Sequence, residues 1–514
     1  MMKQGILLFF LLVSLKVFSN DTIFIPSDQV FFDTEKMLSL SNFNVEEINR
    51  KNGLLKRYIM IDDLFEIIPA VREINVGTPY TIEQLETHEQ YTMYFTQLPI
   101  ISIQSDYEIM DEPSVLASFK MVDNEQNVFN SFIGIQYRGG WSQTYPKKSY
   151  EIELWVDATG NQNYDYSLLG MFSDDKWNIN AMYNEPLKIR SKTSNEIWKK
   201  INKLHYQAQE PEACNGIQME YVEVFVNNNY KGIYYLGEKI NRKHLGLKKY
   251  NGSIRGELYK GSDWGTTTFS SLPPYQNSSI EWGGFEYKYP DEEVNWSNLY
   301  SFADFVINST HSEFYNNHFN YFHQGNAVDY FIFLNLARAT DNTGKNIYIA
   351  KYKQGDKYFY VPWDLDGTFG IVWDGSVQNV TWGLLKNGFY ERLMHDCKED
   401  GFMEGVANKW QDLRSDFLTH DSLLVFFSNN YQFLLNNGVY ERESIAWPEY
   451  EFDPDGFEYL SNWLSDRIDY LDVKFVEPCI PIGINEFMPD LNEVIIYPNP
   501  ANDYLYIQNL RATD

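Results

Sequence analysis

Two aspartates, Asp364 and Asp366, stand one residue apart in the stretch VPWDLDGTFG. The apolar residues before them make ionised carboxylates costly unless a cation or hydrogen-bond donors meet them. An Asx turn at the end of a strand is one explanation for the pair. Phosphoryl transfer is another, because carboxylate and amide oxygens hold Mg²⁺ against the transferred phosphates.

The residues upstream favour phosphoryl transfer. Asp341 follows an expected helix, and Asn346 comes five positions later at the start of an expected strand. An Asp and an Asn at this spacing, followed by an Asp after a β-hairpin, form the arrangement that protein kinases use. In that chemistry Asp341 orients the acceptor hydroxyl, while Asn346 and Asp364 hold the metal. The usual His-Arg before the catalytic Asp and Phe-Gly after the metal-binding Asp are both absent.

A phosphate-binding lysine is expected from the strand-rich part of the chain. Lys147 and Lys148 enter an expected strand after a glycine-containing turn, with Arg138 and Ser142 nearby. In an acidic protein, paired lysines at the start of a strand also fit a guard against edge-to-edge aggregation. Glu238, where an expected strand ends, is either a surface glutamate or part of the hinge that contacts the adenine in a two-lobed kinase.

The elements that must position these residues fall into two halves. Alternating and continuous apolar runs predict strands in the first half, and the period lengthens to a helical one from Asn295. A short hairpin, with strands expected over 347–353 and 358–364, interrupts the helical half, and one helix is expected earlier, over 184–201. This order predicts an α+β fold with two lobes that share a cleft.

Composition limits the function classes. The chain has 514 residues, of which 44% are hydrophobic, so it is long enough for two to four domains. Its net charge of −29 argues against nucleic-acid binding, which rests on lysines and arginines that neutralise phosphates. Any polyanionic ligand therefore needs a local cation or a metal.

The first 97 residues contain a short apolar segment followed by a longer segment without a chemical motif. Residues 1–20 have a lysine followed by an apolar run, Ile6–Leu15, which is typical of a cleavable signal peptide and too short to span a bilayer. No later run is long enough for a membrane helix. Residues 21–97 carry no chemical motif, and their role stays open.

Three cysteines, Cys214, Cys397 and Cys479, lie far apart without metal-ligand spacing. At most one pair can form, and buried free thiols are expected.

Four ordered segments resemble the spore-coat CotH kinase family: FIGIQYRGGWSQTYPKKSYEIEL, EVFVNNNYKGIYYLGEKI, ATDNTGKNIYIAKY and VPWDLDGTFG. Members of this family are secreted, atypical protein kinases with a divergent kinase fold. The resemblance runs over residues 98–475. It implies a two-lobed, protein-kinase-like α+β fold, with a strand-rich N-lobe over 98–260 and a helix-rich C-lobe over 290–475.

The resemblance also implies roles for single residues. Asp341 is the expected catalytic carboxylate, and Asn346 and Asp364 are the expected metal ligands, with Asp366 supporting the metal site. The expected nucleotide-contacting residues are Lys148, its neighbour Lys147, Arg138, Ser142 and Glu238. The implied cofactors are ATP and Mg²⁺ or Mn²⁺, and the implied acceptor is a protein hydroxyl.

One segment departs from the family pattern. Where many relatives read Asp-Lys-Ser before Ile-Arg-Asn, this chain has Asn184-Glu185-Pro186 before Ile189-Arg190-Ser191. Glu185 is a candidate replacement for the acid, and Arg190 matches. We assign no lysine-pairing glutamate from the expected helix, and Glu196 is only a candidate.

The C-terminal stretch EVIIYPNPANDYLYIQNL resembles the start of the sorting domain of Bacteroidetes type IX secretion. We expect a truncated sorting domain over 485–514, recognised by the type IX machinery. Together with the signal peptide, it predicts a secreted or cell-surface protein.

The resulting hypothesis is a secreted, Mg²⁺-dependent kinase that phosphorylates Ser or Thr side chains of extracellular or surface proteins. One alternative is a catalytically inactive kinase-like module that binds surface partners through exposed Tyr and Trp. Another is a glycosyltransferase with an Asp-x-Asp metal motif at Asp364 and Asp366, which leaves Asp341, Asn346 and the lysine-bearing hairpin unexplained.

Overall fold

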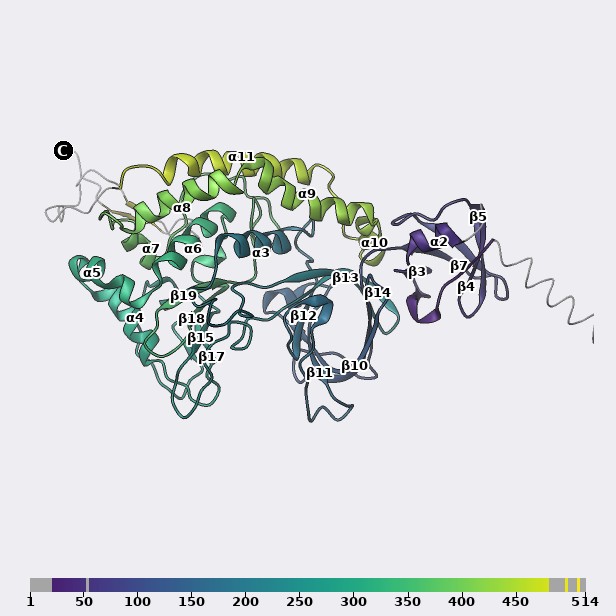
Figure 1. Cartoon of the computed structure of the whole chain (residues 1–514), viewed down its shortest axis with the longest axis horizontal. Helices are drawn as coiled ribbons and strands as arrows, with labels where there is room; N and C mark the ends of the chain where they lie inside the picture. Colours follow the sequence, from purple (N-terminus) through teal and green to yellow (C-terminus); the bar gives the residue numbers. More distant parts are fainter. Residues whose placement is uncertain (1–20, 52–54, 480–494, 498–505, 509–514) are drawn as a thin grey trace, which may run out of the picture.

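The computed structural model describes residues 21–51, 55–479, 495–497 and 506–508. It has a strand-rich N-terminal region and a helical C-terminal region, as the sequence predicts (Figure 1). The expected signal peptide, 1–20, lies outside the described residues. So does most of the expected sorting domain, 485–514, of which only the paired strands β20 (Ile495–Tyr497) and β21 (Tyr506–Gln508) are described.

The first unit, to which the sequence assigned no role, is a seven-stranded sheet at one end of the molecule (Figure 1). Its strand order is β1-β4-β5-β6-β7-β3-β2, and helix α2 (Val45–Lys51) belongs to the same segment. The strands are β1 (Thr22–Phe24), β2 (Val30–Asp33), β3 (Leu38–Ser41), β4 (Lys56–Met60), β5 (Leu64–Val71), β6 (Tyr80–Gln84) and β7 (Gln90–Phe95).

A closed seven-stranded barrel follows, in the order β10-β11-β12-β14-β13-β8-β9. Alternate side chains point inward, as in Ile133 and Ile135 on β10 and Ile152 and Leu154 on β11, and fill the barrel with an apolar core. The expected hairpin of β10 and β11 is confirmed. The strands are β8 (Ile100–Gln104), β9 (Val115–Val122), β10 (Val128–Arg138), β11 (Ser149–Trp155), β12 (Lys176–Asn180), β13 (Met219–Val226) and β14 (Asn229–Gly237).

A five-stranded sheet in the order β16-β17-β15-β18-β19 carries the chemistry-bearing hairpin. Ile347 on β18 pairs with Pro362 on β19, so the residues just outside this pair, Asn346 and Trp363, lie at one end of the hairpin, with Asp364 next to them. The strands are β15 (Glu257–Gly261), β16 (Glu281–Trp282), β17 (Phe285–Tyr289), β18 (Ile347–Lys351) and β19 (Tyr358–Pro362).

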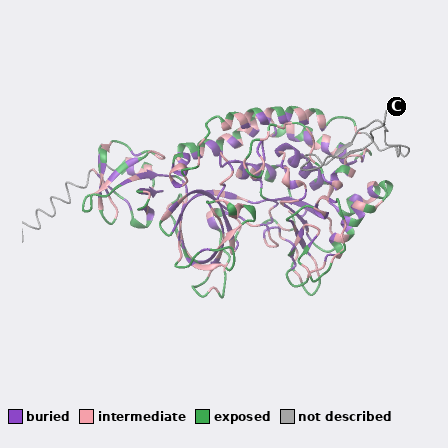
Figure 2. Ribbon diagram, turned by 180° about the vertical axis from the view of Figure 1, so that it is seen from behind, coloured by how far each residue is buried: buried purple, intermediate pink, exposed green. Residues whose placement is uncertain are grey.

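The helices form the other side of the molecule. In Figure 1, α8, α9 and α11 run along the outer edge, and α3 and α6 lie between them and the strands. Figure 2 shows the outward faces of these outer helices as exposed and the interior as buried. The helices are α3 (Arg190–Ile201), α4 (Ser297–Asn308), α5 (His311–Tyr321), α6 (Gln324–Ala337), α7 (Gly388–Leu393), α8 (Phe402–Asp416), α9 (His420–Asn436), α10 (Val439–Ala446) and α11 (Gly456–Lys474).

One helix boundary differs from the prediction. The helix expected over 184–201 begins only at Arg190. The preceding residues form a turn in which Lys188 has a left-handed backbone (φ +61°). Pro186 cannot donate a backbone hydrogen bond, and the Glu185 carboxylate instead accepts the backbone N–H groups of Leu187 and Arg190.

Helix α10 lies against both the N-terminal sheet and the barrel. The Tyr94 hydroxyl donates to the Glu441 carboxylate (3.1 Å), and the Gln97 backbone N–H donates to the Asn437 side chain just before α10 (2.7 Å). A shared apolar cluster, which includes Leu40 and Phe225 and reaches Ala446, fills the junction. The N-terminal sheet is therefore packed directly onto both the barrel and α10.

The cysteine expectation is wrong for two of the three residues. Cys397 and Cys479, 82 residues apart, form a disulfide, and Cys214 is a free thiol. Among the described residues, no helix is both long enough and apolar enough to cross a membrane.

Candidate active site

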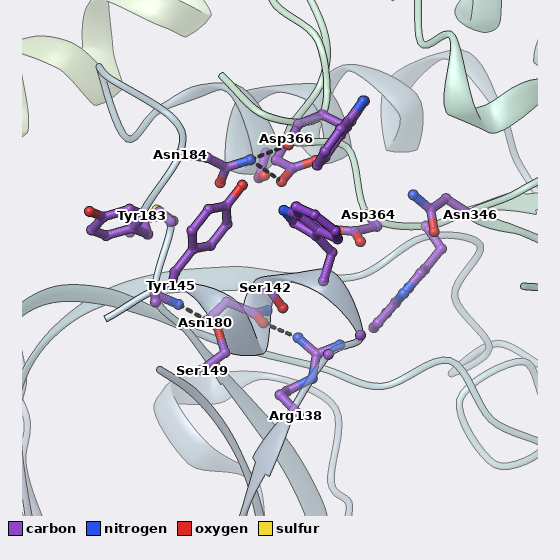
Figure 3. Close-up of a pocket in the computed structure, with 18 of the residues that line it drawn as sticks. Arg138, Ser142, Tyr145, Ser149, Asn180, Tyr183, Asn184, Asn346, Asp364 and Asp366 are labelled. Atoms are coloured by element: carbon purple, nitrogen blue, oxygen red, sulfur yellow. Dashed lines mark hydrogen bonds between the residues drawn. The ribbon is translucent and has the colours of Figure 1, made fainter. Parts of the chain in front are cut away.

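A cavity of about 390 Å³ opens between one end of the barrel and the five-stranded sheet (Figure 3). The barrel side contributes the turn after β10, the segment after β12 and part of β14. The other side contributes β15 and the residues just before β18 and just after β19, which lie together at one end of that hairpin. The predicted site residues that line the cavity are Arg138, Ser142, Lys147, Asp341, Asn346, Asp364 and Asp366.

Asp341 lies in the turn that directly follows the C-terminal end of α6. The C-terminal residue of α6 is followed by Arg338 in a left-handed conformation (φ +47°), and a 3₁₀ turn begins at Asp341. The buried side chain of Asn342 then donates to the backbone carbonyls of Asn346 and Trp363, each at 2.7 Å. The loop that carries Asp341 is thus tied to both chain segments at one end of the hairpin.

Asn346 and Asp364 share an uncommon backbone conformation. Both lie in the left-handed region, at φ +55° and φ +54°. Asn and Asp tolerate this region better than other side chains that carry a Cβ. The Trp363 backbone N–H donates to the Asn346 carbonyl (3.0 Å), which holds the two candidate ligands at one end of the hairpin.

The carboxylates of the cavity interact electrostatically. Burial raises the pKa of Asp341, the Lys345 ammonium opposes that rise, and the Asp364 charge adds to it. Burial and then the Asp364 charge hold the pKa of Asp366 well above its usual range. The Asn184 side chain donates to Asp366 (3.1 Å), as Figure 3 shows. The cavity therefore concentrates negative charge and oxygen atoms at one end.

Arg138 forms the opposite wall, at the end of β10. Its guanidinium donates to the side-chain oxygen of Asn180 (Figure 3) and lies 5.7 Å from the centre of the Trp363 ring. The turn that follows needs glycine, because Gly139 has φ +101° and a Cβ there would lie 2.0 Å from the Ser142 hydroxyl oxygen. Arg138 and Ser142 thus lie at the cavity, as the sequence analysis expected.

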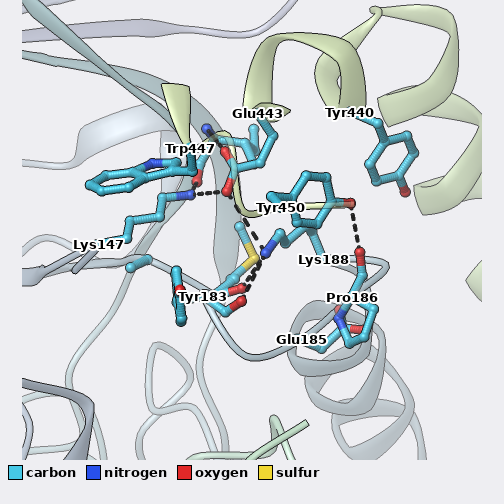
Figure 4. A network of polar contacts seen from close by, with 12 residues as sticks. Lys147, Tyr183, Glu185, Pro186, Lys188, Tyr440, Glu443, Trp447 and Tyr450 are labelled. Atoms are coloured by element: carbon cyan, nitrogen blue, oxygen red, sulfur yellow. Dashed lines mark hydrogen bonds and ion pairs between the residues drawn. The ribbon is translucent and has the colours of Figure 1, made fainter. Parts of the chain in front are cut away.

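Lys147 contributes to the wall, and its ammonium points toward Glu443 of α10 (Figure 4). The Nζ donates to Glu443 Oε1 and to the Ile233 carbonyl, both at 2.6 Å, and the side chain is wholly buried. Burial lowers the pKa of Lys147 to about 8, against the opposing effect of the Glu443 charge. Lys188 lies 3.8 Å from the same carboxylate.

Two further predicted residues, Lys148 and Glu238, do not line the cavity. The Lys148 ammonium donates to the carbonyls of Gln143 (2.6 Å) and Tyr145 (2.7 Å). The Glu238 carboxylate is buried, accepts two backbone N–H groups and lies 3.0 Å from His244 Nε2. Glu238 therefore supports the end of β14 in this structure.

Some cavity residues have no place in the sequence prediction. Lys260, Asn180, Asn184, Trp141 and Trp373 line it, and Asn342 fixes its loop. Asn342 had one signal, its position directly after Asp341. Trp141 is next to Ser142, and Trp373 follows Asp366 by seven residues, whereas Lys260, Asn180 and Asn184 come from other segments that only the fold brings to the cavity.

The glutamate that pairs with the candidate phosphate-binding lysine is not Glu196 of the expected helix. Glu196 pairs with Lys192 (3.1 Å), and Glu185 forms a buried ion pair with Arg190 (2.6 Å). The carboxylate that meets Lys147 belongs to Glu443 on α10.

A second acidic group, Asp165, Asp174 and Asp175, lies outside this cavity. The Lys243 ammonium contacts all three carboxylates, at 2.6, 2.6 and 2.9 Å. A cation of the chain itself therefore already contacts all three carboxylates of this cluster.

A family model described as CotH kinase protein matches residues 135–471. The match covers more than half of the chain, which therefore belongs to the CotH kinase family, a family of atypical kinases. It starts inside β10, so the barrel strands β8 and β9 precede the matched region. No curated protein matches the chain.

Proposed function

We propose that this protein is an ATP-dependent protein kinase that transfers the terminal phosphate to Ser or Thr hydroxyls of proteins outside the cytoplasm. The observation that carries the proposal is the convergence of Asp341, Asn346 and Asp364 on one cavity, from three separate positions along the chain. A two-lobed kinase-like arrangement, with the barrel as the smaller lobe, would place the nucleotide in this cavity.

The donor set fits a hard divalent cation. Asn346 and Asp364 present an amide oxygen and a carboxylate at one end of the hairpin, with the Asp366 carboxylate two residues further on. Oxygen ligands of this kind suit Mg²⁺ or Mn²⁺. When bound, such an ion neutralises charge on the phosphates. The chain supplies the ligands already fixed, because Asn342 and the hairpin hold them without the ion.

In the proposed reaction Asp341 accepts a hydrogen bond from the acceptor hydroxyl and orients it. The hydroxyl oxygen forms a bond to the γ-phosphorus while the bond to the β–γ bridging oxygen breaks, and ADP leaves with that electron pair. The hydroxyl proton passes to the Asp341 carboxylate. The fixed loop around Asn342 keeps this carboxylate in place, so the transfer requires little reorganisation.

A second candidate function is a binding module without catalysis. Trp141 and Trp373 line the cavity and are 64% and 44% exposed, with their ring centres 5.7 Å apart. Exposed aromatic rings at a cavity suit recognition of a sugar or a peptide. The glycosyltransferase alternative gains no comparable support, because it gives Asp341 and Asn346 no role.

We also propose that the protein works outside the cytoplasm, as a secreted or surface protein delivered by type IX secretion. The signal-like N-terminus and the Tyr-Pro-Asn-Pro stretch motivate this proposal. The Cys397–Cys479 disulfide supports an oxidising compartment. Immunoblotting of culture medium, washed cells and periplasm tests it. Exclusive recovery from the cytoplasm would contradict it.

The decisive experiment measures transfer of labelled γ-phosphate from ATP, with Mg²⁺ or Mn²⁺, to the protein itself and to a Ser/Thr-rich protein mixture. Asp341→Ala should abolish transfer and retain nucleotide binding, whereas Asp364→Ala should also lose metal-dependent binding. Asp374→Ala is the matched control, because Asp374 is exposed on the loop that follows Asp366. Full activity in both site variants would refute the assignment, and no transfer or metal-dependent ATP binding by the wild type would favour the binding module.

A further inference from the structure

The two lysines expected to bind phosphate are already satisfied by the chain. Lys147 is held by Glu443 and a backbone carbonyl, and Lys148 by two backbone carbonyls. Two of the three N–H groups of each ammonium are thus already used, and an anionic ligand would compete with these partners. Breaking the buried pair would also leave the Glu443 carboxylate without its closest cation, which is costly. The candidates to meet a polyphosphate are therefore the other cations that line the cavity, Arg138, Lys260 and Lys345.

Lys260, on β15, lines the cavity on the side that carries Asp341, Asn346 and Asp364. In the sheet register it stands opposite Glu286 on β17 and Tyr348 on β18, so the three side chains share one face of the sheet. That face is continuous with the cavity wall, because Tyr348 packs edge-on against Trp363 (5.9 Å between ring centres).

No hydrogen bond or ion pair of the Lys260 ammonium is found among the described residues, although charges surround it. Its cross-strand neighbour Glu286 instead pairs with Lys288, at 2.8 Å. Burial lowers the pKa of Lys260, the Glu286 and Asp364 charges oppose this, and Lys288 and Arg138 reinforce it. A half-buried ammonium without an acceptor is costly in the free protein, and an anion in the cavity would offset that cost.

Lys345 is the other lysine at this end of the cavity, and it has a different role. It lies four residues after Asp341, on the same loop, and its charge lowers the pKa of that carboxyl. Lys345 therefore has an electrostatic partner in the free protein. Lys260 also lies in the field of acidic groups, Glu286 and Asp364, but the carboxylate opposite it in the sheet, Glu286, makes its ion pair with Lys288.

We propose that Lys260 binds the phosphates of the nucleotide beyond the α-phosphate. This inference rests on the proposed function and assigns the phosphate-binding cation to β15 of the five-stranded sheet. Placed beside the candidate metal ligands, the ammonium meets the outer phosphates, and a ligand with only one phosphate does not reach it.

Titration calorimetry with ADP and with AMP, each with Mg²⁺, tests this assignment on the full-length protein. Because a hydrogen bond to a charged group contributes about 1.5–3 kcal/mol, Lys260→Met should weaken ADP binding about 10- to 100-fold. AMP binding should stay unchanged, and Lys260→Arg should recover most of the ADP affinity. Lys148→Met is the matched control, because the Lys148 ammonium donates to two backbone carbonyls and does not line the cavity, and it should bind ADP as the wild type does.

The outcomes separate this inference from the proposed function. If Lys260→Met binds ADP as tightly as the wild type, the proposed function stands and the role of Lys260 is overturned. An equal loss of AMP and ADP binding also overturns it, because the effect would then be general. A wild type that binds neither nucleotide overturns both. Thermal unfolding of each variant verifies that Lys260→Met is folded, and Lys260→Gln, which keeps a polar side chain without the charge, provides the same test if it is not.

Discussion

The Lys147 ammonium and the Glu443 carboxylate lie 2.6 Å apart in the structure and 296 residues apart in the sequence. The second oxygen of Glu443 accepts the Ile233 backbone N–H (3.0 Å). Lys188, next to the same carboxylate, donates to the carbonyls of Met182 and Tyr183. A single carboxylate on α10 thus links the start of β11, the middle of β14 and the segment after β12.

Removing the charge of Glu443 should destabilise the whole fold. Glu443→Gln leaves Lys147 as a buried ammonium without its counter-ion, and breaking a buried pair in this way costs about 3–5 kcal/mol. Urea unfolding of the wild type and the variant measures the difference. Glu451→Gln, at an exposed position after α10, should change the free energy of unfolding little. Equal stability of Glu443→Gln and Glu451→Gln would contradict the importance of the pair.

Gly232 should be needed for the same contact. A Cβ at Gly232, which has φ +85°, would lie 2.1 Å from Glu443 Oε2. Gly252 is a matched control, because it has φ +90° and no atom near its missing Cβ. Gly252→Ala should lose about 1–2 kcal/mol from left-handed strain alone. Gly232→Ala should lose about 1–3 kcal/mol more through overpacking, measured by urea unfolding. Similar losses in both variants would show that the carboxylate moves freely.

His323 should make stability fall with acidification. Its Nδ1 accepts the Asn326 backbone N–H (3.2 Å) and caps α6, the helix that leads to Asp341. Burial, the stacked His205 and Lys357 lower the pKa of His323 to about 4, and Asp356 opposes them.

The ordinary histidine pKa is about 6.5, so between this pH and about 4 the unfolded chain binds more protons than the folded chain. The free energy of unfolding therefore falls as the pH drops through this window. His323→Asn keeps a capping oxygen without titrating there. Urea unfolding at pH 7 and pH 5 should show a smaller loss in His323→Asn than in the wild type, and parallel losses would exclude His323 as the cause.

The disulfide should contribute measurably to stability. Cys397 and Cys479 close a loop of 82 residues that contains α8 to α11. Cross-links of this span stabilise proteins by about 2–5 kcal/mol, chiefly by restricting the unfolded chain. A reducing agent, or Cys397→Ala with Cys479→Ala, should lower the free energy of unfolding by this amount. Cys214→Ser should change it little, and an oxidised protein no more stable than the reduced one would contradict the prediction.

The hairpin that carries the candidate metal ligands could be predicted from sequence, because its signals are local. The strands β18 and β19 read as apolar runs bounded by turn residues, and Asn346 and Asp364 follow from their ends. The β10–β11 hairpin was equally visible, through alternating residues on both sides of Gly139. Such elements depend on contacts between residues near in sequence, which a periodic pattern records.

The contacts between distant segments left no local signal. The pairing of Lys147 with Glu443 depends on where α10 packs, and nothing around Glu443 distinguishes it from Glu441. Nothing in the sequence around Lys260 sets it apart from other strand lysines, since its lack of an acceptor is a property of the assembled sheet. The burial of α6 on all sides from Asn326 to Ala337 also depends on the elements that cover this helix, which a local pattern does not show.

The late position of α10 has a consequence for biosynthesis. The ribosome delivers Asp341, Asn346 and Asp364 well before Glu443, so a nascent chain contains the chemistry-bearing residues while Lys147 still lacks its counter-ion. Domains generally fold as units from the N-terminus during synthesis. In this protein the N-terminal sheet and most of the barrel can form early, but both wait for α10 to complete their shared contacts. The buried contact of Lys147 beside the cavity can therefore form only after α10 has been synthesised.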